Sequence, residues 1–305
     1  MRHWTLFYDW LNGRGGLKEW PCLELDARPT CHPVPSDNIE DVLPRAAKLS
    51  LINYYFKIEY KHRSKEELLK IADSIQINLT IDDVRFIEKI TKDRNNWYWE
   101  KLQAGRVSSS QFKSVCEANL SAPDLELLTE ICYPEKCVRV PDANETDRVA
   151  TLSFISQMEK LHANFSYEKV GLILDQNYPY FAATPGGLCS CDCCGKYVVA
   201  IKCPFGSTKN VSIENLMQMK DSFMEMKNGA HCLRKDHRYY YELQMQMALC
   251  NTKFAWFHIW STRFRITNRI WFNSKFWEEN SQQALNFAKK VISVELMNSY
   301  FTHTY

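Results

Sequence analysis

Apolar and polar residues alternate with a helical period in three parts of the chain. After Ser64, apolar residues recur at helical spacing, and the segment Ser-Lys-Glu-Glu at 64–67 is typical of a capping box at a helix start. Thr80 and the acidic residues that follow it precede a second run of this kind, through residue 90. A third helix is expected over residues 146–163, where apolar side chains again recur at helical spacing.

Short apolar runs between turn residues predict strands in the second half of the chain. The clearest is residues 198–203, Val-Val-Ala-Ile-Lys-Cys, which Gly195 and Pro204 bound. Because side chains alternate between the faces of a strand, Ala200 and Lys202 should share one face. Further strands are expected at residues 170–174, 181–184 and 254–260. Helices and strands together predict an α/β protein.

Composition limits the class of protein. The 305 residues, 45% of them hydrophobic, suit one sizeable α/β domain with an N-terminal addition. Residues 1–60 are rich in Trp, Pro and Cys and show little periodicity, so an irregular arm is expected there. A net charge of +2 is too small to indicate nucleic-acid binding by itself, so any DNA contact needs a local basic surface.

The sequence contains no run of 18 apolar residues, so we expect no membrane span and no membrane partner. The first residues contain neither a long apolar stretch nor a small-residue cleavage site, which argues against secretion. We therefore expect an intracellular protein, nuclear or cytoplasmic. The five Asn-x-Ser/Thr sequons are then chance matches, at Asn78, Asn119, Asn144, Asn164 and Asn210.

Two segments resemble the nuclease core of the YqaJ viral-recombinase family, which is related to nucleases of the lambda-exonuclease type. Residues 184–187 read Thr-Pro-Gly-Gly where the family has Thr-Pro-Asp-Gly, and residues 200–204 read Ala-Ile-Lys-Cys-Pro where it has Glu-Ile-Lys-Cys-Pro. In that family the Asp and the Glu hold a divalent metal, and the Lys assists the attacking water. Gly186 and Ala200 therefore stand at two lost acid positions, while Lys202 remains as a remnant of the catalytic site.

The resemblance implies Mg²⁺ or Mn²⁺ as the cofactor. These cations prefer hard oxygen ligands, and they activate water only when they are held in place. With Gly186 and Ala200 at the acid positions, we expect the metal to bind poorly. Because the turn and the strand look intact, the sequence also predicts that Gly186→Asp with Ala200→Glu would recover some metal binding.

Residues 99–112 resemble the start of the family's domain. Arg106 and Ser110 match the family pattern, while Gln103 replaces the first of its two arginines. The resemblance implies that Arg106 and Ser110 hold a phosphate at a DNA end, which suits a guanidinium and a hydroxyl group. Residues 108–110 also suit a helix cap, and the two interpretations are compatible.

Two further segments resemble helices that contribute to the family's site. Residues 147–154 fit the pattern Glu-x-x-Ala-x-x-x-Tyr, with Asp147 as a shortened counterpart of the acid. Residues 239–247 resemble a glutamine-rich helix beside the active site, with Gln244 and Gln246 retained and Glu242 in place of a glutamine. Asp147 and Glu242 are thus candidate Mg²⁺ or Mn²⁺ ligands. Each also has an ordinary interpretation, as an acid at a helix start or as a surface carboxylate.

The resemblance extends over about residues 80–295 and implies a restriction-endonuclease-like, PD-(D/E)XK fold. In this fold a mixed central sheet is flanked by helices. We accordingly expect a YqaJ-like exonuclease-fold domain at residues 80–305. Residues 1–79 would form an N-terminal extension that is partly irregular and partly helical.

Four of the twelve cysteines lie within six residues, and Cys189 and Cys191 should share a strand face. Zinc prefers thiolate and imidazole ligands, so Cys189, Cys191 and Cys194 are candidate zinc ligands. Reduced thiols are the alternative, and disulfides are disfavoured in a reducing compartment. Further residues that could contribute a ligand are Cys193, Cys203, His231, Cys232 and His237.

The sequence leaves three functions open. It favours a catalytically inactive nuclease-fold protein that still binds DNA ends or a protein, because decay explains two lost carboxylates more simply than two compensating migrations. The second is an active metal-dependent DNA exonuclease with a rearranged site of Asp147, Glu242 and Lys202. The third is a zinc-stabilised interaction module. The resemblance also implies DNA recombination as the setting and a homo-oligomer, which is a ring in relatives.

Overall fold

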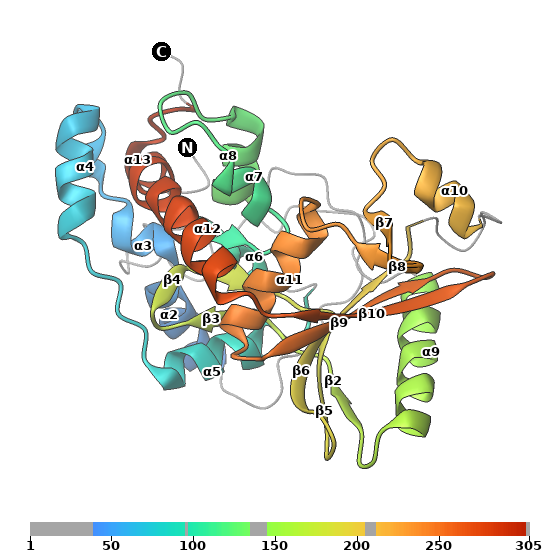
Figure 1. The fold of residues 1–305 in the computed structure, drawn as a ribbon. Helices are drawn as coiled ribbons and strands as arrows, with labels where there is room; N and C mark the ends of the chain where they lie inside the picture. The colour runs from blue at the N-terminus through green and yellow to red at the C-terminus, as the bar shows by residue number, and fades with distance from the viewer. Residues whose placement is uncertain (1–38, 95–96, 135–144, 205–211, 303–305) are drawn as a thin grey trace, which may run out of the picture.

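The computed structural model describes residues 39–94, 97–134, 145–204 and 212–302. In these residues, helices pack around β-sheets of different size (Figure 1). The irregular arm expected at the N-terminus lies largely outside the described residues. None of the described helices is long and apolar enough to cross a membrane.

The helices of the first half include the one with the expected capping box and the one expected to start after Thr80. Ser64 Oγ accepts a hydrogen bond from the Glu67 N–H, and Glu67 accepts one from the Ser64 N–H, so this capping box is confirmed. Thr80 and Asp83 cap the next helix in the same way. The helical segments before residue 135 are α2 (Ile39–Leu49), α3 (Leu51–Tyr55), η1 (Ile58–Tyr60), α4 (Lys65–Ser74), α5 (Ile81–Ile90), α6 (Trp97–Gln103), α7 (Phe112–Cys116) and α8 (Leu125–Cys132).

The helices of the second half include the one expected over residues 146–163, and near the C-terminus a π-helical turn joins two of them into one long rod (Figure 1). The helices are α9 (Glu145–Leu161), α10 (Ile213–Gln218), α11 (Arg238–Leu249), α12 (Ser274–Phe287), the π-helix η3 (Ala288–Ile292) and α13 (Ser293–Asn298).

The central sheet has five strands in the order β10-β9-β6-β5-β2. Strands β6 and β9 run parallel, and the other neighbours are antiparallel, so the sheet is mixed as expected. Strand β6 lies in the middle of the sheet, and both α11 and α9 pack against it. The strands are β2 (Ser166–Glu168), β5 (Gly187–Cys191), β6 (Gly195–Lys202), β9 (Phe254–Trp260) and β10 (Arg265–Trp271).

A second sheet, in the order β1-β4-β3, corrects one expectation. The sequence predicted that residues 170–174 and 181–184 would join the same sheet as residues 198–203 and 254–260. Instead, β4 pairs with β1 and β3, because the chain turns between the end of β4 and the start of β5. The remaining strands are β1 (Val107–Ser108), β3 (Ile173–Asp175), β4 (Tyr178–Ala183) and the hairpin of β7 (Met224–Lys227) and β8 (Ala230–Leu233).

Alternate side chains of β6 pack against different helices. Val198 and Ala200 belong to an apolar cluster with residues of α11. Tyr197 and Val199 belong to another cluster with residues of α9. The face that Ala200 and Lys202 share is therefore the face that α11 covers.

The helices before residue 80 pack into the largest core. Leu51 and Leu68 lie in one buried cluster with Phe287 and Leu296 of the C-terminal helices. This part of the chain is therefore packed on the body of the protein. The division into residues 1–79 and 80–305 stays a prediction.

Candidate functional site

Lys202, the residue retained from the expected metal site, forms an ion pair with Glu242 of α11. Its Nζ lies 3.0 and 3.1 Å from the two carboxylate oxygens and 4.5 Å from the ring centroid of Tyr239. The Lys202 and Glu242 side chains are only 24% and 12% exposed. The charge of Lys202 is therefore compensated by a carboxylate that the family pattern does not contain.

A second contact brings a distant segment to this pair. Gln246 Nε2 donates to Glu242 Oε1 at 3.2 Å and to Ser109 Oγ at 3.4 Å. Ser110 follows on the surface, with its Oγ 3.0 Å from that of Ser108. Two segments 137 residues apart in the sequence thus meet beside the Lys202–Glu242 pair.

The two lost acid positions lie close by but offer no room for a carboxylate at Gly186. A Cβ atom built on Gly186 would lie 2.7 Å from the carbonyl oxygen of Val199, much closer than real Cβ contacts. The Gly186 carbonyl also accepts a hydrogen bond from Tyr167 Oη at 2.7 Å. Ala200 is 3% exposed and packed in the core under α11. The residues at these positions do not fit Mg²⁺ or Mn²⁺, which require several oxygen ligands.

The turn that contains Gly186 is nevertheless held firmly. Arg94 Nη2 donates to the carbonyl oxygens of Pro185, at 2.7 Å, and of Val170, at 3.2 Å. Trp99 Nε1 donates to Thr184 Oγ1 at 3.4 Å. The scaffold of the turn persists although its acid has been lost.

Asp147 does not join the Lys202 pair. It lies in the first turn of α9, beside the Cys203 thiol. Burial and the nearby Asp147 carboxylate raise the pKa of that thiol to about 12. Within the described part of the chain, no group of three potential metal ligands forms around Lys202. The structure thus brings together Glu242 and Lys202 of the expected rearranged site, and places Asp147 against a different neighbour.

Arg106 is completely buried, and its guanidinium faces the backbone. It donates to the carbonyl oxygens of Pro179 at 3.0 Å, of Leu49 at 2.8 Å and of Leu102. Burial lowers its pKa to about 10, so it stays protonated at neutral pH. These surroundings argue against the phosphate contact expected for Arg106 and give it a structural role, whereas Ser110 is exposed as a phosphate contact requires.

Gln244 is also buried and is satisfied by the backbone. Its Nε2 donates to the Trp271 carbonyl at 2.9 Å, and its Oε1 accepts from the Asn273 N–H at 2.8 Å. Gln246, which lies four residues after Glu242 and so on the same face of α11, is the glutamine at the site. The match of residues 239–247 to the family's helix had already indicated Gln246 from the sequence.

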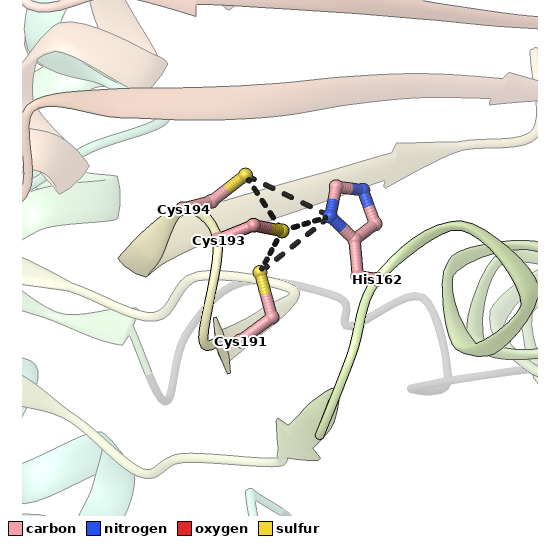
Figure 2. Close-up of side chains that lie close together, drawn as sticks. All are labelled: His162, Cys191, Cys193 and Cys194. Atoms are coloured by element: carbon pink, nitrogen blue, oxygen red, sulfur yellow. Dashed lines mark hydrogen bonds between the residues drawn. The ribbon is translucent and has the colours of Figure 1, made fainter.

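Four side chains with metal-binding groups converge at the turn between β5 and β6 (Figure 2). They are His162, Cys191, Cys193 and Cys194, and their ligand atoms all lie within 4.8 Å of one another. Burial raises the pKa of the Cys191 thiol. Hydrogen bonds from Cys193 and from the Cys194 N–H lower it more strongly, so the net pKa of Cys191 lies below the usual value for cysteine.

Two of the three cysteines expected as zinc ligands, Cys191 and Cys194, belong to this cluster. Cys189 does not, because it is 2% exposed in the core, where burial raises its pKa to about 12. Sequence spacing gave no signal for His162, which lies 29 residues before Cys191 and reaches the turn only through the fold.

Comparisons with known proteins agree with this nuclease-type α/β domain. The family model for the YqaJ-like viral recombinase domain matches residues 98–254, just over half of the chain. The protein therefore belongs to the YqaJ-like viral recombinase domain family. No curated protein matches the sequence.

Solved structures are similar at low sequence identity. The SOX protein of KSHV, in a complex with RNA, is 11% identical with a TM-score of 0.50, over 79% of each chain. The alkaline exonuclease LHK-Exo from Laribacter hongkongensis is 18% identical with a TM-score of 0.47, over 66% of this chain and 94% of that one. The likeness to SOX supports the fold alone, and the expected restriction-endonuclease-like class is confirmed.

Proposed function

We propose that this protein is a non-cleaving member of its family that binds nucleic-acid ends. The loss of cleavage is supported by the residues that stand where the family pattern has its two metal-binding acids. Gly186 and Ala200 provide no ligand, and the Val199 carbonyl occupies the space that an acid at residue 186 would need. Hydrolysis of the phosphodiester bond by this class of nuclease requires a metal held at those positions.

The pairing of Lys202 gives independent support for this proposal. An amine that assists an attacking water has to be free to contact that water. Here both oxygens of Glu242 lie within hydrogen-bonding distance of Lys202 Nζ. Glu242 therefore balances the positive charge of Lys202, which the metal-binding acids of the family pattern would otherwise have balanced.

Nucleic-acid binding is supported by the family and by the retained surface beside the site. SOX, which shares the fold, was solved in a complex with RNA. In this chain Ser110 is exposed next to the segment that contacts Gln246 and, through it, Glu242. A hydroxyl at such a position can donate to a phosphate oxygen. Because the net charge is only +2, we expect moderate affinity that falls as salt increases.

Fluorescence anisotropy with a short DNA duplex that carries a 5′ phosphate, at about 50 to 200 mM salt, tests the binding. Ser110→Asp should weaken binding about fivefold or more, because the new carboxylate repels phosphate. The matched control is Lys70→Met on α4, an exposed site far from the central sheet in Figure 1, which should leave the Kd within about twofold. Absence of binding at the lowest salt, or equal Kd values for wild type and Ser110→Asp, would refute nucleic-acid binding at this surface.

One observation favours a second candidate, an active exonuclease with a rearranged site. Glu242 adds a carboxylate beside Lys202 that the family pattern lacks. A metal that displaced Lys202 from this carboxylate would still need further oxygen ligands, and Asp147 lies against Cys203 instead. A cleavage assay on linear DNA with added Mg²⁺ or Mn²⁺ separates the two candidates.

A further inference from the structure

We propose that His162, Cys191, Cys193 and Cys194 bind one zinc ion, and that this ion links the end of α9 to the β5–β6 turn. The site would be structural, because four protein ligands fill a tetrahedral zinc and leave no position for water or substrate. It lies apart from the Lys202 pair, and it does not depend on the proposed nucleic-acid binding.

Most of the distances between the four side chains match a tetrahedral site. With zinc bonds of about 2.3 Å to sulfur and about 2.1 Å to nitrogen, neighbouring ligand atoms should lie about 3.5–3.8 Å apart. Cys191 and Cys193 Sγ are 3.5 Å apart, and Cys193 and Cys194 Sγ are 3.6 Å apart. His162 Nδ1 lies 3.6 and 3.7 Å from the sulfurs of Cys191 and Cys194 (Figure 2). Its distance of 3.0 Å from Cys193 Sγ is a hydrogen-bond distance, which would lengthen when both atoms bind zinc.

The backbone holds these side chains together without help from a metal. The Asp192 N–H donates to the Ala163 carbonyl at 3.1 Å, and Asn164 Nδ2 donates to the Asp192 carboxylate at 2.7 Å. Gly195, with a φ of +70°, closes the turn in a conformation that other residues rarely adopt. The segment after α9 and the β5–β6 turn are therefore already docked, so the ligands are largely preorganised for zinc.

The surroundings of the cluster suit its charge. Three thiolates, one imidazole and Zn²⁺ together have a net charge of −1. Arg269 Nη2 lies 4.0 Å from Cys194 Sγ and would offset that charge. Its guanidinium is fixed over the rings of Phe254 and Trp256, at 4.8 and 4.7 Å from the centroids. The Arg269 cation therefore lies where it can reduce the repulsion among the three thiolates.

A disulfide, packed reduced thiols and a hard cation each fit the cluster less well than zinc does. A disulfide requires sulfurs about 2.05 Å apart, and these are 3.5 Å apart or more. Packing of reduced thiols does not account for Cys193, which is exposed yet directed at the other three groups. Mg²⁺ and Ca²⁺ require oxygen ligands, whereas a Cys₃His set is a common structural zinc site.

Metal analysis of the purified full-length protein tests the proposal. We expect about one equivalent of zinc in the wild type and less than about a fifth of that in Cys193→Ser and His162→Ala. His162→Cys should retain zinc, because thiolate can replace imidazole. The matched control is Cys189→Ala, two residues before Cys191 on the same strand, which should retain it too.

A second measurement needs no variant and so does not depend on whether the variants fold. Addition of Co²⁺ to the metal-free wild type should produce the visible absorption bands of tetrahedral, thiolate-bound cobalt, and zinc should abolish them. A strong chelator should lower the melting temperature of the wild type but not of Cys193→Ser, because metal binding is coupled to folding. A wild type without zinc and without cobalt bands would overturn the proposal, as would equal loss of zinc in Cys189→Ala.

Discussion

Lys202 of β6 and Glu242 of α11 form a shielded ion pair, with 3.0 Å between Nζ and Oε1. The lysine is inherited from the nuclease pattern, whereas the glutamate replaces a glutamine of that pattern. A carboxylate of α11 thus balances the charge of a lysine that is largely shielded from water. A half-buried lysine without a nearby acid would be costly, and Glu242 supplies the negative charge.

We expect Lys202→Met and Glu242→Gln each to lower the free energy of unfolding, because each leaves its partner partly buried and unpaired. In a double-mutant cycle, the two residues should show a coupling of about 1 kcal/mol or more, measured by urea denaturation. The matched control is the exposed pair of Arg148 and Glu145 on α9, which should show no measurable coupling. Equal coupling in the two cycles would contradict a special role for the Lys202 pair.

Restoring the lost acids should not restore the metal site. The Cβ of Gly186→Asp would meet the Val199 carbonyl, and Ala200→Glu would place a charge in the core. We expect the double variant to have a lower melting temperature than the wild type and to show no gain in Mn²⁺ affinity by calorimetry.

Gly186→Ala separates the steric effect from the effect of charge and should by itself lower the melting temperature. A double variant that binds Mn²⁺ with unchanged stability would show that the turn has room for the acid. That outcome would favour the prediction from the sequence that restoring both acids recovers some metal binding.

Arg106 should contribute to stability rather than to recognition of a DNA end. Arg106→Met leaves three backbone carbonyls without their donor, and we expect a loss of about 3 kcal/mol or more in the free energy of unfolding. Arg106→Lys should recover little of it, because an ammonium cannot reproduce the guanidinium geometry. The ratio of Kd values for 5′-phosphorylated and 5′-hydroxyl DNA should not change. A stable Arg106→Lys variant that no longer prefers 5′-phosphorylated over 5′-hydroxyl DNA would refute a purely structural role for Arg106.

Local patterns were sufficient to predict much of the fold. The capping box at Ser64 and the helix start after Thr80 are confirmed because a cap depends on residues only three apart. Strand β9 agrees with its expected range, 254–260, because its apolar run is long and bounded by turns. The assignment of β4 to the central sheet was wrong, since strand pairing depends on the tertiary fold and not on the strand's own sequence.

The candidate site was predicted less completely, for a related reason. Motif positions indicated Gly186, Ala200 and Lys202 as parts of one site; the structure places Gly186 next to Val199 and Ala200 of β6, and the role of these positions stays a prediction. They could not indicate that Arg106 points into the core or that His162 reaches the cysteine turn, because both depend on contacts between distant segments. A match to a motif predicts where the backbone lies more reliably than where a side chain points.

Stability should fall on acidification through His258. This residue is fully buried, with Nδ1 2.8 Å from Thr267 Oγ1, and burial lowers its pKa to about 4, with a smaller effect from Arg265. The unfolded state, with a pKa of about 6.5, binds more protons between pH 6.5 and 4, so the free energy of unfolding decreases as pH falls through that range.

Urea denaturation at pH 7 and pH 5 measures this effect, which should amount to about 2 kcal/mol from His258. The change in the free energy of unfolding between pH 7 and pH 5 should be smaller by that amount in His258→Gln. Exposed His62 provides the control, and His62→Gln should behave as the wild type does. The same pH dependence in His258→Gln as in the wild type would show that His258 is not its source.

Cleavage of linear DNA in Mg²⁺ or Mn²⁺ is the decisive measurement of whether this nuclease fold still cuts nucleic acid. The purified protein should leave the DNA intact, and Lys202→Ala should give the same result, because no metal is held beside the lysine. Metal-dependent cleavage by the wild type that disappears in Lys202→Ala and persists in Lys70→Met would contradict the proposed loss of activity and establish a rearranged active site.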